Sequence, residues 1–409
     1  MRAAQAVSCG RTPTTRETPM TENISVVVVG GGYAGVMAAN RLTQRDDVTV
    51  TLINPRSNFV HRIRLHQLVG GTGDAVVGYR DILADRVRLV VDTASRIDAA
   101  ERTVSLANGG TVRYDYLIYA VGSGSADPDV SGADECAHSV ASLEEARRLR
   151  SVLATTPTAD VVTVVGAGAT GIEVAAELAA EGRAVTLVCG RVLHPYLHPR
   201  VRRKFAKRLA RLGVTVIDGP GARVTAVSRD AVLLADGREL PSTVTIWTAG
   251  FSVPDLAVRS GLTTDAAGRL LTDETLTSVD DDRVVAAGDS AAPSNLPLRM
   301  SCQSANPLGA HAADTVLSRI AGGQPATIVI GFFGQCVSLG HGAATVQIAS
   351  KNDIAKGFTV GGFLGARIKS ASFTGLIEHL AHEAHEPGSF TWKFRDDTRH
   401  RRLEALAAR

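Results

Sequence analysis

The chain has 409 residues, of which 44% are hydrophobic and 21% are charged, and its formal net charge is +3. This length allows two or three domains, and the composition is typical of a globular protein rather than a disordered one. The small net charge does not favour nucleic-acid binding, so no nucleic-acid partner is expected. No apolar run reaches the roughly 18 residues that a membrane-spanning helix needs.

The cysteines show no C-x-x-C pair and no spacing typical of metal ligands. They are Cys9, Cys136, Cys189, Cys302 and Cys336. We therefore predict reduced thiols in a cytoplasmic protein with no metal site. Residues 1–22 contain several arginines and threonines but no continuous apolar segment, which indicates a disordered lead-in rather than a secretion signal.

The first glycine motif follows a β-branched run at residues 25–29 and leads into an alanine-rich helical stretch that ends at Leu42. It reads Gly30-Gly31-Gly32-Tyr33-Ala34-Gly35. In a G-x-G-x-x-G turn the first glycine makes the tight turn, the second lets the backbone approach a pyrophosphate and the third lets the helix pack on the strand. The N–H groups and the positive dipole end at the helix start then bind phosphates. We predict that a dinucleotide is bound by Gly30, Gly32, Tyr33, Ala34 and Gly35.

The next strand, residues 48–53, ends at Asn54, where an acid usually binds the adenosine ribose hydroxyls. An amide can also hydrogen-bond a hydroxyl, so Asn54 is a candidate ligand. Arg62, in the segment that follows, is a candidate for binding phosphate or substrate. Strand-like segments then follow at residues 86–91, 103–106 and 116–121. The last of them ends on Gly122, before a linker rich in Gly, Ser and Pro.

The motif recurs after a predicted helix at residues 143–153 and a β-branched run at 161–165. This second match, in the same strand-turn-helix context, indicates a second dinucleotide site that includes Gly166, Gly168, Thr170 and Gly171. The following strand, 185–188, ends in Cys189-Gly190-Arg191. No acid there repels a 2′-phosphate and Arg191 can pair with one, so the pattern favours NADPH, with NADH left open.

The rest of the chain alternates between helical and strand-like segments. A helix at 201–212 and strands at 214–217 and 244–248 lead to Ala249-Gly250, and a strand at 283–287 runs into Gly288-Asp289. We expect a helix from Pro307-Leu308 to Ile320, strands at 336–339 and 345–349, and a loosely held charged tail beyond Trp392. Residues 358–380 are apolar but contain four glycines, so they fit either a membrane-docking segment or an element of a soluble domain.

The ordered set of motifs resembles the two-dinucleotide-binding flavoprotein family of pyridine-nucleotide oxidoreductases. Besides the two glycine motifs, it comprises Ala120-Val121-Gly122, Thr248-Ala249-Gly250 and Ala287-Gly288-Asp289. The resemblance covers about residues 24–320 and implies that the first glycine motif binds FAD and the second binds NAD(P)H. It also implies that Gly122, Gly250 and Gly288 line the cofactors, and that Asp289 hydrogen-bonds the FAD ribitol. The helix start at Pro307-Leu308 would then stabilise the reduced flavin.

Disulfide reductases of this kind carry a cysteine pair beside the flavin, and this chain has none. The chain is similar to type II NADH dehydrogenases and apoptosis-inducing-factor-like enzymes, which reduce quinones without such a pair. The segment 170–175 resembles their T-G-x-E-x-A motif, which implies that Glu173 lies near the nicotinamide and flavin rings. The alternative is a solvated helix face formed by Glu173, Glu177 and Glu181. The segment 302–305 resembles their A-Q-x-A motif, with cysteine replacing alanine, which implies that Gln303 lies by the flavin and quinone.

The predicted fold is α/β, with two Rossmann-like dinucleotide-binding domains and a small C-terminal α+β region. The NAD(P) domain is inserted in the FAD domain. We expect a discontinuous FAD-binding domain at residues 23–135 and 251–325, an NAD(P)H-binding domain at 136–250 and the C-terminal region at 326–409.

The predicted function is transfer of hydride from NAD(P)H to FAD and then of electrons to a quinone-type acceptor. The alternatives are an NAD(P)H reductase for a ferredoxin- or rubredoxin-like carrier and a slow-turnover flavoprotein redox sensor. Peripheral contact with the inner face of the membrane and a homodimer are left open.

Overall fold

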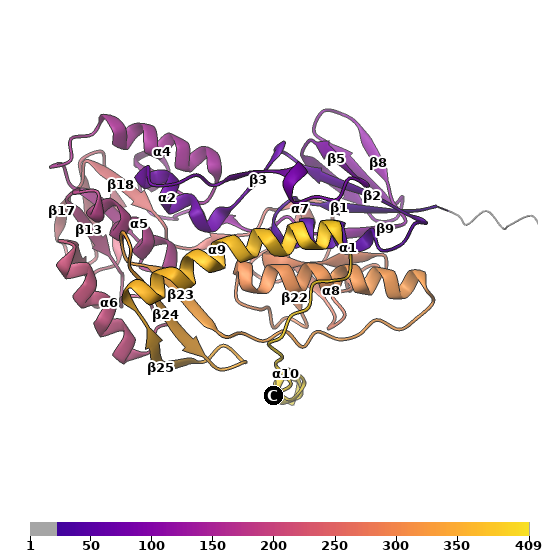
Figure 1. Ribbon diagram of the computed structural model, residues 1–409. Helices are drawn as coiled ribbons and strands as arrows, with labels where there is room; N and C mark the ends of the chain where they lie inside the picture. Colours follow the sequence, from indigo (N-terminus) through magenta and orange to yellow (C-terminus); the bar gives the residue numbers. More distant parts are fainter. Residues whose placement is uncertain (1–22, 409) are drawn as a thin grey trace, which may run out of the picture.

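Two parallel five-stranded sheets organise residues 23–408, the part of the chain that this computed structural model describes (Figure 1). The first sheet has the order β21-β9-β1-β2-β5. Its strands are β1 (Ile24–Val29), β2 (Val48–Asn54), β5 (Val87–Val91), β9 (Tyr116–Tyr119) and β21 (Val284–Ala286). Most β-branched residues of the central strands are buried, because both faces of a parallel sheet are covered.

Helices cover one face of the first sheet and an antiparallel sheet covers the other. α1 (Tyr33–Leu42) and α8 (Cys302–Ile320) share one core with the sheet. A Cβ on Gly309 would lie 2.2 Å from the carbonyl oxygen of Ala34, so the close approach of these helices requires glycine. The opposite face packs against β6 (Ala94–Asp98), β7 (Thr103–Leu106), β8 (Thr111–Arg113) and α7 (Leu256–Arg259).

The helix predicted to start at Pro307-Leu308 starts earlier, at Cys302, and that prediction is wrong. Ser301 is the N-cap, since its side chain accepts a hydrogen bond from the N–H of Ser304. Pro307 lies inside the helix, where it removes one backbone hydrogen bond without ending α8. The free N–H groups at the start of this helix therefore belong to residues 302 and 303 rather than to 307 and 308.

The second sheet has the order β11-β18-β12-β13-β14. Its strands are β11 (Ala137–Ser139), β12 (Val162–Val165), β13 (Val185–Val188), β14 (Thr215–Ile217) and β18 (Val244–Trp247). Its core includes α2 (Leu65–Gly70), α4 (Leu143–Thr155), α5 (Ala169–Ala180) and α6 (Pro199–Arg211). Every strand of this sheet lies between β9 and β21 in the sequence, so one dinucleotide-binding unit is inserted into the other, as predicted. The domain boundaries themselves remain a prediction.

Shorter elements join these sheets. They are β3 (Asn58–Val60), β4 (Val76–Gly78), β10 (Gly124–Ser125), β15 (Val224–Val227), β16 (Ala231–Leu234), β17 (Glu239–Pro241), β19 (Phe251–Ser252), β20 (Leu270–Thr272), β22 (Ala291–Pro293) and α3 (Ala133–Cys136). Three single 3₁₀ turns are η1 (Arg62–Arg64), η2 (Tyr79–Asp81) and η3 (Gly288–Ser290).

The C-terminal region adds an antiparallel sheet and a long helix that runs across both halves of the molecule (Figure 1). The sheet consists of β23 (Gly334–Ser338), β24 (Ala344–Ala349) and β25 (Ala355–Val360). The helix, α9 (Gly362–His385), is continuous although it contains Gly365 and Gly375. Gly365 serves packing, since a Cβ there would lie 2.2 Å from the carbonyl oxygen of Ala344. Between residues 23 and 408 no helix is both long and apolar enough to cross a membrane.

The charged tail is docked, so the expectation of a loosely held tail is wrong. Arg399 starts α10 (Arg399–Ala407), is only 4% exposed and pairs with Glu274 through two hydrogen bonds of 2.7 and 2.9 Å. It also donates to the carbonyl oxygens of Pro293 and Leu296. The charge of Arg399 is therefore neutralised within the fold. The predicted disordered lead-in, residues 1–22, lies outside the described residues.

Candidate active site

The two glycine loops have nearly the same backbone geometry. Gly30 and Gly166, the first glycines, have φ values of +106° and +105°, in the region that favours glycine. Their N–H groups donate to the carbonyl oxygens of Ile53 and Val188, both at 2.9 Å. Each loop is therefore tied in the same way to the end of the neighbouring parallel strand.

The later glycines of both motifs meet the requirements of a phosphate-binding loop. A Cβ on Gly35 or on Gly171 would lie 1.8 Å from the carbonyl oxygen of the first glycine of its own motif, so neither position tolerates a side chain. Gly32 and Gly168 are exposed, and a Cβ there would meet nothing within 4 Å. The middle glycines thus leave open space beside a helix start, which fits a pyrophosphate in each loop.

Asn54 and Tyr79 hold the first glycine loop in place. The Asn54 Oδ1 accepts a hydrogen bond from the N–H of Gly31 at 3.0 Å, and its Nδ2 donates to the carbonyl oxygen of Arg56 at 2.8 Å. The Tyr79 hydroxyl donates to the carbonyl oxygen of Gly31 at 2.8 Å. The structure therefore gives Asn54 a loop-ordering role that sequence reasoning missed, while its ribose contact remains a prediction.

A polar chain links two predicted cofactor-binding residues, Arg62 and Asp289, at the end of the first sheet. Arg62 Nη1 donates to Ser123 Oγ at 3.2 Å, and Ser123 Oγ donates to Asp289 Oδ2 at 2.7 Å. Asp289 Oδ1 accepts from the N–H of Ser301, the N-cap of α8, at 3.1 Å. Gly122 and Gly288, beside this chain, have φ values of +72° and +71°. Ser123 was missed because a serine in a Gly- and Pro-rich segment looks like an ordinary linker residue.

Tyr33 and His61 form a buried hydrogen-bonded pair beside this chain. The Tyr33 hydroxyl lies 2.9 Å from His61 Nδ1, and the two side chains are 8% and 3% exposed. Burial raises the pKa of Tyr33 well above its usual range and lowers the pKa of His61 to about 4. Both groups are therefore neutral at physiological pH. Ala34 packs behind Tyr33, 3.0 Å from where a Cβ of Gly288 would lie.

Glu173 lies in a buried cluster rather than on a solvated helix face. It is 7% exposed, and Glu177, one turn later, is 4% exposed, so the alternative of a solvated face is wrong for both. Glu173 Oε1 lies 2.8 Å from Lys369 Nζ and accepts from the N–H of Ser338 at 2.9 Å, and Oε2 lies 3.7 Å from His66 Nδ1. Burial opposes ionisation, but the charges of Lys369 and His66 outweigh it and lower the pKa of Glu173. The pKa of Lys369 is raised in return, because the attraction of Glu173 outweighs the cost of burial.

We call the Gly30 loop with the residues around it the first clamp, and the Gly166 loop with the residues around it the second clamp. Phe373, one turn after Lys369 in α9, connects the buried cluster to the first clamp. Its ring centroid lies 5.9 Å from that of His61 and 6.3 Å from that of His66. Lys369 Nζ lies 4.9 Å from the same centroid and the Arg64 guanidinium 5.8 Å. The one signal in the sequence that Lys369 and Phe373 lie side by side is their i, i+4 spacing on a helix, and this signal is weak.

Three of the predicted site residues, Gln303, Pro307 and Leu308, belong to α8. Gln303 Oε1 accepts a hydrogen bond from the N–H of Phe333 at 3.3 Å, so it contacts the segment before β23. Pro307 and Leu308 are buried inside α8. Burial raises the pKa of the Cys302 thiol to about 11, which keeps it protonated. The four cysteines within residues 23–408 are all free, so no disulfide offers a route for electrons there.

Thr248, in the T-A-G segment before Gly250, contacts the backbone of the second glycine loop. Its Oγ1 lies within hydrogen-bond distance of the carbonyl oxygens of Val165 and Gly166, at 2.9 and 3.0 Å. Gly250 has a φ of +83°, and Thr170 is half-buried in the first turn of α5. These residues lie around the Gly166 loop as predicted from their order in the sequence, and their contacts with a nucleotide remain predictions.

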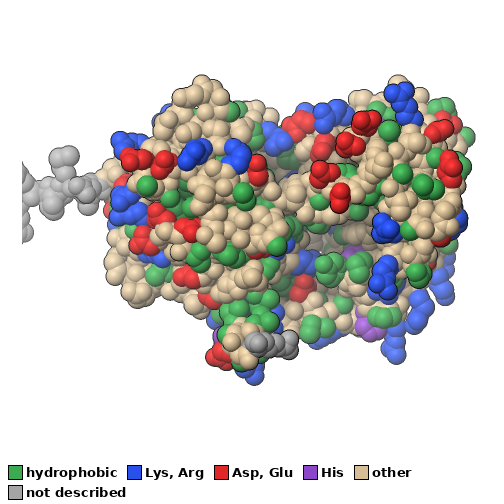
Figure 2. Space-filling view, turned by 180° about the vertical axis from the view of Figure 1, so that it is seen from behind, with side chains coloured by type: hydrophobic (Ala, Val, Ile, Leu, Met, Phe, Trp, Pro, Cys, Tyr) green, Lys and Arg blue, Asp and Glu red, His purple; other side chains and the backbone are tan. Residues whose placement is uncertain are grey.

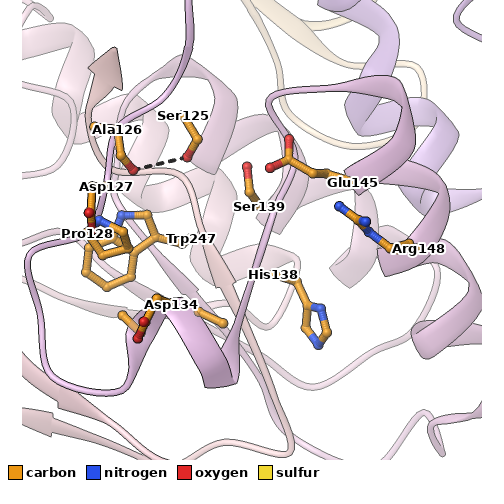
Figure 3. A pocket seen from close by; sticks show the side chains of 12 residues that line it. Ser125, Ala126, Asp127, Pro128, Asp134, His138, Ser139, Glu145, Arg148 and Trp247 are labelled. Carbon is orange, nitrogen blue, oxygen red and sulfur yellow. Dashed lines mark hydrogen bonds between the residues drawn. The ribbon is translucent and has the colours of Figure 1, made fainter. Parts of the chain in front are cut away.

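A cavity of about 350 Å³ lies apart from the predicted residues, at the carboxyl ends of β11 and β18 (Figure 3). Trp247, Asp127 and Asp134 line one side of it, and His138 and Arg148 lie across from them. None of the predicted site residues lines this cavity. Within residues 23–408 no group of three or more His, Cys, Asp or Glu side chains is placed to hold a metal ion.

Two parallel sheets, each with a glycine loop at the start of a buried helix, define an oxidoreductase that binds two dinucleotides. The chain belongs to the pyridine nucleotide-disulphide oxidoreductase family, whose model matches residues 24–313. It is 31% identical over 322 residues to an NADH dehydrogenase-like protein of Mycobacterium tuberculosis, covering 72% of this chain and 80% of the relative. It is 28% identical over 346 residues to a type II NADH:quinone oxidoreductase of the same organism, covering 74% of each chain.

The structure is also similar to that of the sulfide:quinone oxidoreductase from Aquifex aeolicus. The TM-score is 0.75 at 19% sequence identity, over 89% of this chain and 93% of the other, a likeness that shows the fold alone. Family membership confirms the predicted resemblance and the prediction of an oxidoreductase that uses FAD and a reduced nicotinamide nucleotide. The roles of individual residues remain predictions.

Proposed function

We propose that this chain oxidises NAD(P)H bound at the Gly166 loop and passes the electrons through FAD, bound at the Gly30 loop, to a quinone. The observation that carries the proposal is the buried pair of Glu173 and Lys369, which α9 places next to the elements of both loops. When bound, FAD accepts the hydride and releases the electrons to the acceptor. The residues described above bind, orient and shield the two nucleotides.

Phosphate binding falls to the two glycine loops, whose N–H groups lie at helix starts. Asp289, held by Ser123 and Ser301, presents a fixed carboxylate to the ribitol hydroxyls. The α8 N-terminus at residues 302–304 adds positive potential beside it. Together these groups fix the position of the flavin and favour negative charge there.

A quinone takes up two protons when it is reduced to the quinol, and the buried cluster suits that need. Lys369 Nζ holds a proton between Glu173 and the carbonyl oxygen of Cys336, at 2.8 and 3.0 Å. His66 Nδ1 lies on the other side of the same carboxylate. The Phe373 ring adds a flat apolar surface beside these polar groups, which suits a small planar acceptor better than a protein carrier. We therefore propose that Glu173 acts near the nicotinamide and flavin rings, and that Gln303 lies by the flavin and the quinone.

The proposal is tested by anaerobic reduction of the purified, flavin-loaded protein with NADH or NADPH, followed by mixing with acceptors. We expect rapid flavin bleaching and rapid reoxidation by a soluble quinone. Reoxidation by a ferredoxin- or rubredoxin-like protein but not by quinones would instead support the carrier-reductase function. Slow reoxidation by every acceptor would support the function as a redox sensor. If neither nucleotide bleaches the flavin, the quinone reductase, the carrier reductase and the redox sensor are all contradicted.

We also propose peripheral contact with an anionic membrane on the cytoplasmic side, through a surface that we call the α9–β25 surface. It is formed by large apolar side chains that are 58–73% exposed, namely Ile354, Phe358, Phe363 and Leu364. Exposed lysines and arginines flank it: Lys351, Lys356, Arg367 and, on α6, Lys204, which donates to Thr359 at 2.8 Å. Seen from behind, Lys and Arg side chains gather at the lower right, on the α6 side (Figure 2). Apolar side chains ringed by positive charge favour an anionic lipid surface.

Sedimentation with vesicles containing phosphatidylglycerol tests this contact. We expect the wild type to sediment with the vesicles and the double variant Phe358→Ser/Phe363→Ser to remain in solution. Val258→Ser, at a 55% exposed position in α7, is the matched control. Equal sedimentation of all three proteins would contradict the proposal. The homodimer remains a prediction, which sedimentation equilibrium tests.

A further inference from the structure

The two clamps can be compared residue by residue at their adenosine ends. Because Gly30 bonds to Ile53 as Gly166 bonds to Val188, the residues after these two strand ends are structurally equivalent. Asn54 corresponds to Cys189, Pro55 to Gly190 and Arg56 to Arg191. Both clamps therefore place an arginine three positions beyond the strand residue that holds the glycine loop, and the surroundings of these two arginines differ.

In the first clamp the arginine is already paired. Arg56 Nε and Nη2 donate to the two carboxylate oxygens of Glu144 at 2.8 and 2.7 Å. The hydrogen bonds from Arg56 lower the pKa of Glu144 to about 2, so this carboxylate stays charged. A bidentate pair of this kind uses the face of the guanidinium that a phosphate would need. The first clamp therefore presents no free positive charge, which suits FAD, whose adenosine has no 2′-phosphate.

In the second clamp the arginine is free. Arg191 is exposed, and its side chain forms no hydrogen bond or ion pair with any residue between 23 and 408. Its carbonyl oxygen accepts from the N–H of Gly219 at 3.2 Å, which ties the loop to the end of β14. Gly190 has a φ of +65°, and a Cβ there would meet nothing within 4 Å. The backbone of this loop is thus held, while the Arg191 side chain is exposed.

The residue at the end of β13 itself is not an acid, and the nearby acid Asp218 forms no ion pair with Arg191 in the described structure. Cys189 stands where an acid would accept the ribose hydroxyls, and burial raises its pKa to about 12, so it carries no charge. The negative charge that reaches Cys189 comes from Asp218, the exposed residue after β14. The adenosine end of the second clamp therefore combines a free guanidinium with an uncharged strand end.

We propose that Arg191 binds the 2′-phosphate of NADPH and makes the second clamp prefer NADPH to NADH. This inference rests on the proposed function, since it needs a dinucleotide on the Gly166 loop. A guanidinium binds a phosphate through two parallel hydrogen bonds, and the missing acid removes the repulsion that excludes a 2′-phosphate.

Equilibrium binding to the purified, FAD-loaded protein tests the proposal without turnover. Calorimetry compares NADP⁺ with NAD⁺, and adenosine 2′,5′-bisphosphate with AMP, so that the second pair reports on the adenosine end alone. We expect the phosphorylated member of each pair to bind at least about tenfold more tightly. Arg191→Gln should remove this difference and leave the affinity for NAD⁺ unchanged. Cys189→Glu should reverse the preference.

Arg229→Gln is the matched control, at an exposed arginine between β15 and β16, and should keep the wild-type preference. The inference is overturned if the wild type binds NAD⁺ as tightly as NADP⁺. It is also overturned if Arg191→Gln weakens both nucleotides to the same degree. If no nucleotide or fragment binds at all, the proposed function is contradicted as well. Failure of the inference alone and failure of the proposed function therefore give different results.

Discussion

Lys369 and Glu173 form an ion pair in which the Nζ and Oε1 atoms are 2.8 Å apart and both side chains are almost completely buried. The pair joins α9 of the C-terminal region to the helix that starts at the second glycine loop. One turn further along α9, Phe373 packs against His61, which is hydrogen-bonded to Tyr33 of the first loop. A single helix therefore couples the two nucleotide-binding units through one polar and one aromatic contact.

Removing one member of this pair should destabilise the protein strongly. Lys369→Met leaves a charged carboxylate buried without its partner, which costs about 3–5 kcal/mol. Urea unfolding measures the loss. The double variant Glu173→Gln/Lys369→Met, in which neither charge is buried, should recover most of it. Equal stability of the single and double variants would contradict this, because it would show that the unpaired Glu173 carboxylate carries no cost.

Stability should fall as the pH decreases from about 6.5 to about 4. Burial lowers the pKa values of His61 and His194 to about 4, whereas in the unfolded chain each imidazole binds a proton near pH 6.5. Between these values the unfolded state binds more protons, so each histidine lowers the free energy of unfolding by about 1.4 kcal/mol per pH unit of acidification. His194→Leu should reduce this slope in denaturant titrations at several pH values. His400→Leu, at an exposed position, should leave it unchanged.

Alanine substitutions in the glycine loops should separate folding from binding. Gly168→Ala places a methyl group in open space, so the protein should fold and keep its flavin but bind NAD(P)⁺ at least about tenfold more weakly. Gly32→Ala should instead weaken flavin retention. Gly171→Ala creates a contact of 1.8 Å with a backbone oxygen and should prevent normal folding. Flavin absorbance and nucleotide calorimetry distinguish these results, and wild-type nucleotide affinity in Gly168→Ala would count against the phosphate assignment.

Ser123 should matter for flavin binding although it follows a glycine in an apparent linker. Ser123→Ala removes the hydrogen bonds to Arg62 and Asp289, so the Asp289 carboxylate loses one of its two anchors. We expect flavin to dissociate about tenfold more readily, in line with about 1–1.5 kcal/mol for one such hydrogen bond. Fluorescence of released flavin measures this effect. Ser125→Ala is the control, and an equal effect of both variants would contradict the assignment.

The docked tail should contribute to global stability. Arg399→Leu leaves Glu274 and two carbonyl oxygens without their partner, which should cost about 3–5 kcal/mol. Thermal unfolding of this variant and of Arg401→Leu, an exposed neighbour in α10, tests the point. A similar melting temperature for the two variants would mean that the tail is docked without stabilising the fold.

The sequence predicted the two clamps well because their geometry is local. A G-x-G-x-x-G turn needs glycine for backbone reasons that act within six residues, and the strands before it are recognisable from their β-branched residues. The order of the motifs was then sufficient to predict the family, the fold and two dinucleotides. Boundaries were less certain: the helix was predicted to start at Pro307-Leu308, whereas the N-cap at Ser301 starts α8 at Cys302.

The surroundings of charged side chains could not be predicted in the same way, because they depend on residues that are distant in sequence. The spacing of Glu173 and Glu177 fits a solvated helix face, and only the packing of α9 and β23 on α5 buries Glu173 beside Lys369. Arg56 and Arg191 look alike in the sequence, and only the position of Glu144 leaves one paired and the other free. The sequence by itself thus determined where the backbone can hold phosphates, which is a local steric property. The tertiary structure decided which charges are buried, paired or free, because Coulomb and desolvation energies depend on distances in space.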